Sequence, residues 1–136
     1  MIVGIGVDLC KISRIAQATA MFGDRFAQKI LTNAERTASD LSVERAALLA
    51  GSFAAKEACA KALGVGIETR IRWHEIEVLG SKSRKPSIRL SGNAQLCAAE
   101  LTPPDHELTL HLTLTHTSAI AQALVVLEAI GRGGRG

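Results

Sequence analysis

The segment from Phe53 to Gly64 constrains the fold of this chain more than any other segment. Its pattern predicts the last three turns of a long helix that begins after Ser42, and Gly64 stands where a left-handed C-terminal cap is expected. Glu57 and Lys61 are four residues apart, so their side chains leave the same face of this helix. A carboxylate can hold a hard cation and an ammonium can hold phosphate oxygen. The alternative is an ordinary surface ion pair.

Residues 2–9 predict the first strand, because apolar residues alternate with small or polar ones. The apolar set, which we expect to face the core, is Val3, Ile5, Val7 and Leu9. The opposite face carries Gly4 and Gly6 and ends in the carboxylate of Asp8. Glycine weakens a strand, so two glycines on one face require a reason. Close approach of a ligand or another chain is one reason, and tight packing against a helix is an equally good one.

The remaining pattern predicts an α+β fold in which an antiparallel sheet packs against the long central helix. Ser13, the capping box of Thr32 and Glu35, and Ser91 mark the starts of further helices. These helices are expected at about 13–22, 25–30, from 32 onward and 91–101. Strands are expected at 73–79, 86–90, 107–116 and 119–127. We therefore expect one domain over residues 1–128 and a disordered tail at 129–136.

The composition argues against several classes of protein. With 136 residues the chain can form one domain with a real core. Aromatic residues make up only 3%, which disfavours nucleic-acid modules that stack bases on aromatic side chains. The three cysteines are scattered without a CxxC pair, so we expect reduced thiols and a cytoplasmic protein. Neither a membrane span nor a signal peptide is expected from the apolar pattern.

Positive charge is concentrated in two segments, although the net charge is only +3. The first segment, residues 11–36, has five basic and two acidic residues, and residues 82–89 have four basic residues and no acid. Such local patches suit an acidic protein or a polyphosphate ligand better than a long nucleic-acid track. Solvated faces that keep the protein soluble are an equally good explanation from the charges alone.

Several motifs together resemble one family. They are GIGVDL at 4–9, ISRI at 12–15, FAAKEACAKALGVG at 53–66, WHEIEV at 73–78, KP at 85–86 and LTHT at 114–117. In order and spacing they resemble bacterial holo-[acyl-carrier-protein] synthase, a 4′-phosphopantetheinyl transferase. The resemblance covers residues 2–128 and implies a 4′-phosphopantetheinyl transferase-like fold.

The resemblance also implies an activity. The family moves 4′-phosphopantetheine from coenzyme A to a serine of apo acyl carrier protein and releases adenosine 3′,5′-bisphosphate, a step that supports fatty acid biosynthesis. It implies that Asp8 and Glu57 hold Mg²⁺ together with the coenzyme A diphosphate. Lys61 matches the lysine that contacts phosphate.

Further positions match the coenzyme and partner sites of this family. Those matched to the coenzyme or nucleotide are Gly64, Pro86, His116 and Thr117. Arg14 matches a position that contacts the acidic carrier protein, and Arg25 extends the same basic segment. The resemblance further implies a homotrimer whose three sites lie at subunit interfaces.

The chain departs from the family pattern at three positions. Ser52 stands where many members carry arginine, Ala60 where some carry serine, and Ser118 where an acidic residue is frequent. These departures weaken the transfer of secondary coenzyme contacts. They leave the metal pair and the lysine unchanged.

The chemistry needs mainly positioning and charge neutralisation, because the attacking serine belongs to the carrier protein. Mg²⁺ is typically held by one or two carboxylates with substrate phosphate and water. Gly4 and Gly6 are expected to keep the Asp8 face low, leaving room for a diphosphate. A metal-polarised water, Asp8 or His116 could accept the serine proton, and we favour the water or Asp8. His116 could instead be a structural residue at a strand end.

Two other functions remain open from the sequence. A non-catalytic module that binds coenzyme A or a nucleotide could use the same patches, although simple binding does not need a pair of metal ligands. A small basic RNA-binding domain is the other alternative, and it lacks the stacking aromatics and the signatures of such domains.

Overall fold

The computed structural model describes residues 1–38, 45–80 and 85–133. The helices are α1 (Ile12–Phe22), α2 (Asp24–Ile30), α3 (Asn33–Ala38), α4 (Arg45–Leu63) and α5 (Gly92–Leu101), with a short 3₁₀ helix, η1 (Trp73–Glu75). The strands are β1 (Ile2–Lys11), β2 (Ile76–Leu79), β3 (Ser87–Leu90), β4 (His106–His116) and β5 (Ile120–Gly131). Ser42, the expected cap of the long helix, lies outside the described residues, as do Lys82 and Arg84 of the second basic segment.

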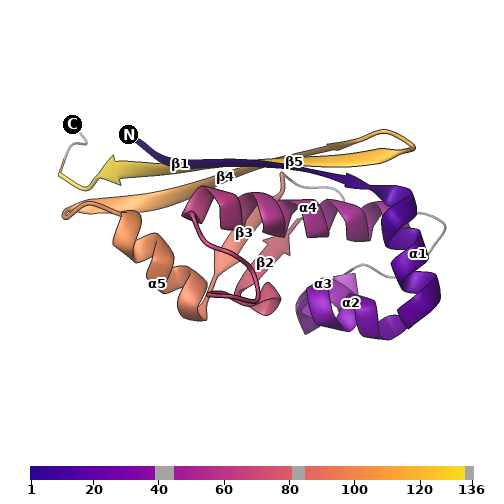
Figure 1. Ribbon diagram of the computed structural model, residues 1–136. Coiled ribbons are helices and arrows are strands. Elements are labelled where there is room, and N and C mark those ends of the chain that lie inside the picture. The colour runs from indigo at the N-terminus through magenta and orange to yellow at the C-terminus, as the bar shows by residue number, and fades with distance from the viewer. Residues whose placement is uncertain (39–44, 81–84, 134–136) are drawn as a thin grey trace.

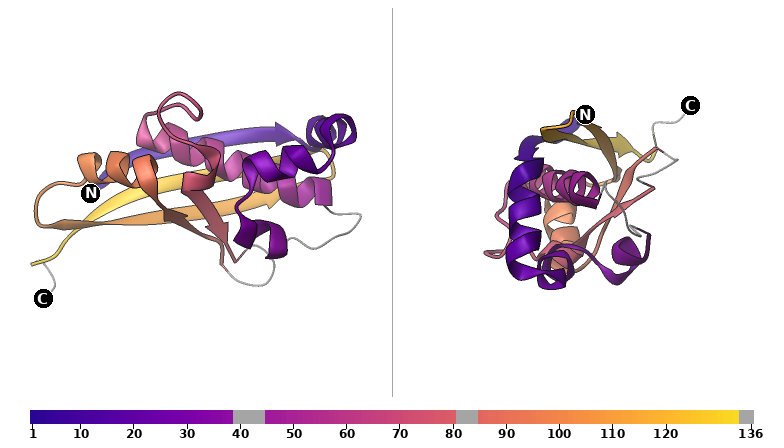
Figure 2. Two further views of the ribbon diagram at one scale, coloured as in Figure 1. Left: turned by 90° about the horizontal axis from the view of Figure 1, so that it is seen from below. Right: turned by 90° about the vertical axis from the view of Figure 1, so that its right-hand side faces the viewer.

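The long helix α4 lies between two layers (Figures 1 and 2). On one side is a three-stranded antiparallel sheet in the order β1-β5-β4. On the other side lie the β2–β3 hairpin and the shorter helices. The predicted α+β class, with an antiparallel sheet packed on a long helix, is therefore confirmed.

The predicted orientation of β1 is wrong. Three of the four side chains expected in the core lie on the outer face, and the exposed fractions of Ile5, Val7 and Leu9 are 64%, 46% and 62%. Only Val3, at a register irregularity of the strand, packs partly buried against the core. The opposite face is the buried one, since Gly6 pairs with the fully buried Val125 of β5. The outer face of the sheet therefore carries an apolar stripe that nothing in this chain covers among the described residues.

The two glycines of β1 allow α4 to touch the strand backbone. A Cβ atom added at Gly4 would lie 2.2 Å from the carbonyl oxygen of Ala62, and one added at Gly6 would lie 2.0 Å from that of Ala58. Of the two explanations for the glycines, packing against a helix is thus the correct one. The expectation that they leave room for a diphosphate is wrong, because α4 occupies that space.

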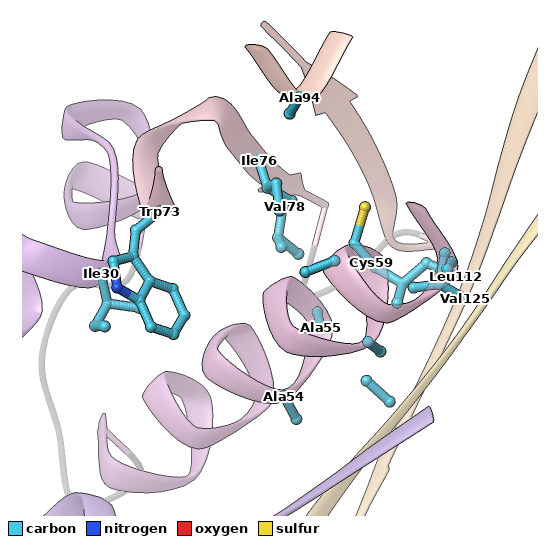
Figure 3. Packing of buried hydrophobic residues seen from close by; sticks show 14 of the residues in the cluster. Ile30, Ala54, Ala55, Cys59, Trp73, Ile76, Val78, Ala94, Leu112 and Val125 are labelled. Carbon is cyan, nitrogen blue, oxygen red and sulfur yellow. The ribbon is translucent and has the colours of Figure 1, made fainter. Parts of the chain in front are cut away.

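Helix α4 is buried on almost every side, and its small side chains make this possible. Its buried residues include Ala50, Ala54, Ala55, Ala58, Cys59, Ala60 and Ala62. Ile30 and Trp73 lie together on the side of α4 away from the sheet, whereas Leu112 and Val125 come from the sheet (Figure 3). Phe53 contacts Trp73, with ring centroids 5.1 Å apart. Within the described ranges, no helix is long and apolar enough to cross a bilayer.

The glutamate of η1 changes two predicted boundaries. Glu75 Oε1 accepts a hydrogen bond from the backbone N–H of Arg72 at 2.8 Å, so residues 73–75 form a turn of 3₁₀ helix and strand β2 starts only at Ile76. Glu75 Oε2 accepts the N–H of Asn93 at 2.8 Å, a capping bond that the Ser91 side chain does not make. Gly92 begins α5 with φ = 55°, in the left-handed region that glycine adopts without strain.

Two further ends differ from the prediction. Helix α1 begins at Ile12, with Lys11 rather than Ser13 at the N-cap position and no side-chain cap. Strand β5 continues to Gly131, and the N–H of Ala129 donates to the Met1 carbonyl oxygen at 2.8 Å. Residues 129–131, which the sequence placed in the tail, therefore belong to the sheet.

Candidate active site

Strand β1 and helix α4 bring Asp8, Glu57 and Lys61 to one place. Asp8 lies on the inner face of β1, two residues after the glycine against which α4 packs. The Lys61 ammonium donates to Asp8 Oδ1 at 3.0 Å and to the Val7 carbonyl oxygen at 3.1 Å. The Asp8 side chain is only 16% exposed, whereas that of Lys61 is 55% exposed. The Lys61 side chain is thus accessible to a ligand, whereas the Asp8 carboxylate that it contacts is largely buried.

The electrostatics of Glu57 point to a site that favours a cation. Partial burial raises the pKa of the Glu57 carboxyl, and the nearby Asp8 carboxylate raises it further. The positive charges of Lys61 and Arg14 act in the opposite direction. Two close carboxylates, one of them desolvated, repel each other unless a cation lies between or beside them.

The donor set fits Mg²⁺ bound jointly with a phosphate ligand. Within the described part of the chain, no group of three or more histidine, cysteine, aspartate or glutamate side chains could hold a metal ion. Asp8 and Glu57 therefore provide two carboxylates and no complete protein cage. This is the situation in which Mg²⁺ keeps water and takes its remaining ligands from substrate phosphates.

Gly64 ends α4 one turn after Lys61, as the sequence predicts. It has the left-handed value φ = 76°, and its N–H donates to the Lys61 carbonyl oxygen at 3.1 Å. The N–H of Val65 donates to the Ala60 carbonyl oxygen at 3.0 Å and closes the cap. No atom lies within 4 Å of a Cβ built at Gly64, so this end of the helix is open.

The other positions matched to the coenzyme lie on different elements from these three residues. His116 and Thr117 lie where β4 turns into β5, and β5 separates β4 from β1. Thr117 Oγ1 accepts the N–H groups of Ala119 and Ile120, both at 3.1 Å, so its hydroxyl shapes the turn. Pro86 directly precedes β3. In the described structure, no hydrogen bond joins His116, Thr117 or Pro86 to the cluster of Asp8, Glu57 and Lys61.

The residues matched to carrier docking lie on α1 and α2. Arg14 is exposed on α1, and Arg25 is exposed on α2. The charge of Arg14 reaches the site, because it lowers the pKa of Glu57. Of the three departures from the family pattern, Ala60 is buried, Ser52 is half-buried and Ser118 is exposed.

A buried ion pair that starts from α4 was not predicted from the sequence. Lys56 is fully buried and its ammonium donates to Glu35 Oε1 at 2.8 Å. Burial lowers the pKa of Lys56, and the Glu35 carboxylate opposes that shift. The one sequence feature that could have indicated this pair is a lysine among small apolar residues in a helix that is buried on most of its faces. The predicted capping box is confirmed, since Glu35 Oε1 also accepts the N–H of Thr32 at 2.7 Å.

Comparison with known sequences finds one family over most of the chain. Residues 4–114 match the 4′-phosphopantetheinyl transferase superfamily. The chain is 48% identical over 130 residues to the holo-[acyl-carrier-protein] synthase of Methylobacterium sp. (strain 4-46), covering 96% of each chain. It is 44% identical over 133 residues to that of Bartonella henselae, covering 98% of this chain and all of the relative.

Solved structures agree with the sequences. The holo-[acyl-carrier-protein] synthase of Neisseria meningitidis superposes with a TM-score of 0.81 at 30% identity, over 94% of this chain and 99% of that chain. The synthase of Bacillus anthracis, solved in complex with coenzyme A (3′,5′-ADP), gives a TM-score of 0.74 at 33% identity, over 96% and 99% of the two chains. A chain with these matches, and with Asp8, Glu57 and Lys61 gathered at one end of β1, belongs to the holo-[acyl-carrier-protein] synthases of the 4′-phosphopantetheinyl transferase superfamily.

Proposed function

We propose that this protein transfers 4′-phosphopantetheine from coenzyme A to a serine of apo acyl carrier protein, with Mg²⁺ as cofactor. The products are holo carrier protein and adenosine 3′,5′-bisphosphate. The observation that carries the proposal is the contact between Lys61 and Asp8 beside Glu57, in a chain whose relatives carry the name of this activity. The Bacillus anthracis synthase, solved in complex with coenzyme A, supports the same co-substrate here.

The roles of the three residues follow from their surroundings. Asp8 and Glu57 would hold Mg²⁺, which when bound neutralises phosphate charge and orients the diphosphate. The exposed ammonium of Lys61 binds a phosphate oxygen and stabilises the negative charge that develops on the leaving bisphosphate. The open end of α4 at Gly64 allows the coenzyme to lie close to the backbone.

The reaction requires one bond to form and one to break. The carrier serine Oγ bonds to the phosphorus that bears pantetheine, and the bond from that phosphorus to the bridging oxygen of the diphosphate breaks. The serine proton leaves to a base. Asp8 is the carboxylate that we favour to accept it, directly or through a water, and within one subunit β5 separates Asp8 from His116.

We propose a homotrimer with active sites between subunits. The outer face of the sheet supports it, because the exposed apolar stripe of β1 lies beside the half-buried Leu124 and Val126 of β5. A monomer in water would leave this face uncovered at an unfavourable free energy. A site shared between subunits would also account for the separation of His116 and Thr117 from Asp8, since a neighbour could supply them.

We propose that the carrier protein docks on α1 and α2. Arg14 and Arg25 are exposed there and would attract the acidic carrier protein. Met21 and Phe22 are exposed at the end of α1, with 75% and 55% of their surface accessible, and can bury apolar surface of a partner. Helix α1 packs against α4, so this docking surface lies beside the helix that carries Glu57.

We place the protein in the cytoplasm and its reaction in fatty acid biosynthesis. Cys10, Cys59 and Cys97 are free and buried, as expected where thiols stay reduced. A holo carrier protein provides the thiol on which acyl chains are carried, so enzymes of acyl-chain synthesis would consume the product.

The intact mass of an apo acyl carrier protein tests the function. After incubation with this protein, coenzyme A and Mg²⁺, the carrier mass should increase by one phosphopantetheine group, and adenosine 3′,5′-bisphosphate should appear in equal amount. A chelator should stop both changes, and excess Mg²⁺ should restore them. An unchanged carrier mass with full coenzyme A binding would show a binding module instead of a transferase.

A further inference from the structure

Lys56 and Glu35 are the only charged side chains that are buried in the described part of the protein. Neither has a role in the transfer reaction described above. A buried ion pair is seldom needed for stability, because apolar residues of similar volume often replace it without loss. Such a pair fixes the relative orientation of the elements that it joins, since its hydrogen bonds form in only one arrangement of them.

The Lys56 ammonium uses all three of its N–H groups. They donate to the Ile30 carbonyl oxygen at 2.6 Å, to Glu35 Oε1 at 2.8 Å and to the Trp73 carbonyl oxygen at 3.1 Å. An ammonium has three donors, so none is left unsatisfied. Through this one group, α4 is bonded to the C-terminal end of α2, to α3 and to η1.

Glu35 extends the connection to the hairpin. Its Oε1 also accepts the N–H of Thr32, and its Oε2 accepts the N–H of Val78 in β2 at 2.8 Å. The carboxylate is therefore held by two backbone groups as well as by Lys56. The Glu35 carboxylate that holds the Lys56 ammonium is thus itself held in place by the backbone just before α3 and in β2.

Lys56 and Glu57 are successive residues of α4, so their side chains point about 100° apart around the helix axis. Lys56 reaches the layer of short helices and the hairpin, and Glu57 lies near Asp8 of β1. Where α4 meets the sheet, the helix contributes mainly alanine side chains and strand β1 contributes Gly4 and Gly6. These contacts set how closely the helix approaches the strand, and the bonds of Lys56 tie the opposite side of the helix to the other layer.

We propose that Lys56 and Glu35 are positioning residues for the transfer reaction. Their bonds set the rotation of α4, and this rotation places the Glu57 carboxylate and the Lys61 ammonium against Asp8. The inference rests on the proposed function for its kinetic consequences. A misplacement of about 1 Å in such a site can cost roughly 100-fold in rate.

The test separates position from stability with a pair of variants. Lys56→Met keeps the length of the side chain and removes the three directional bonds, but it leaves the Glu35 charge buried. The double variant Lys56→Met/Glu35→Gln also removes that charge and keeps one carbonyl acceptor. We expect the double variant to regain part of the Tm that Lys56→Met loses. Its kcat should stay at least about tenfold below that of the wild type.

Two further readouts identify a positioning role. The Mg²⁺ concentration for half-maximal rate should rise in both variants, while KM for the carrier protein stays unchanged. Calorimetric titration with coenzyme A in the presence of Mg²⁺ should show weaker binding. Cys97→Ala is the control, because it removes buried volume in α5 and should lower Tm without changing these constants.

Each outcome decides the question. A double variant with wild-type kcat, Mg²⁺ midpoint and coenzyme affinity would overturn the inference and leave a purely structural pair. If Lys56→Met does not fold, Glu35→Gln alone decides it, with smaller changes of the same sign expected and wild-type constants contradicting it. A wild-type protein that makes no holo carrier refutes the proposed function instead, and the calorimetric comparison still tests the positioning.

Discussion

Replacement of Gly6 by alanine should damage the fold and the active site together. The added Cβ would lie 2.0 Å from the Ala58 carbonyl oxygen, whereas ordinary contact begins at 3.4 Å. Helix and strand must therefore separate by about 1.4 Å at this point, the difference of the two distances. Since Glu57 and Lys61 lie on that helix and Asp8 on that strand, the same movement pulls the site apart.

The size of both effects can be stated. Overpacking of a core contact costs about 1–3 kcal/mol, which corresponds to a fall in Tm of about 4 °C for each kcal/mol in a domain of this size. A displacement of about 1 Å in a site that works by positioning costs roughly 100-fold in rate. We therefore expect Gly6→Ala to lose both Tm in thermal unfolding and kcat in carrier modification.

Gly51→Ala provides the matched control. Gly51 lies in the same helix, and no atom lies within 4 Å of a Cβ added there. Alanine is favoured over glycine in a helix by about 1 kcal/mol, so this variant should be slightly more stable and fully active. If Gly6→Ala kept the Tm of the wild type and lost only coenzyme A binding, the glycine would serve ligand approach and the packing argument would be refuted.

Three other predictions concern the charge pair, the partner and the assembly. The raised pKa of Glu57 means that the folded protein holds this proton to higher pH than the unfolded chain, so the ionised carboxylate costs stability above the folded pKa. Without metal, Glu57→Gln should thus have a higher Tm than the wild type at neutral pH. The difference in Tm should shrink as the pH falls towards the pKa of Glu57 in the unfolded chain, and an equal Tm at all pH values would contradict this. Arg14→Glu should raise KM for the carrier protein more than KM for coenzyme A, and Lys61→Ala should do the reverse; steady-state kinetics with each substrate varied would refute the division if both variants changed the same constant. Val7→Glu places a charge on the outer face of β1 and should convert a trimer to monomers in light scattering with loss of activity, whereas a wild-type protein that is an active monomer would rule out the shared site.

Only part of the active-site cluster could be predicted from spacing. The interval between Glu57 and Lys61 places both on one helix face. Asp8 lies 53 positions before Lys61, and only the family resemblance joined it to the other two residues. The capping box of Thr32 and Glu35 was predictable from spacing, as both partners are three residues apart.

The orientation of β1 could not be predicted from its alternation. A period of two separates the faces of a strand but does not say which face meets the core of its own subunit. The glycine face faces inward because α4 presents backbone carbonyls there, and that fact depends on a helix some fifty residues later in the chain.

The partners of Lys56 and Glu75 were missed for a similar reason. Lys56 bonds to residues 17 to 26 positions away, and Glu75 caps a helix 18 positions away. Side chains that satisfy backbone groups of distant elements leave no periodic signal in the sequence. Only the folded arrangement shows that these groups meet.

The rates of Asp8→Ala and Glu57→Ala test the central claim most directly. Both variants should fold, because neither side chain belongs to the apolar core, and circular dichroism should match that of the wild type. Glu100→Ala, which removes an exposed carboxylate of α5 paired with Arg70, is the control and should be fully active. If Asp8 and Glu57 hold Mg²⁺ for the transfer, each variant should form holo carrier protein at least about 100-fold more slowly at ordinary Mg²⁺ concentrations. Wild-type rates in either variant would contradict the assignment of this pair as the metal site of the reaction.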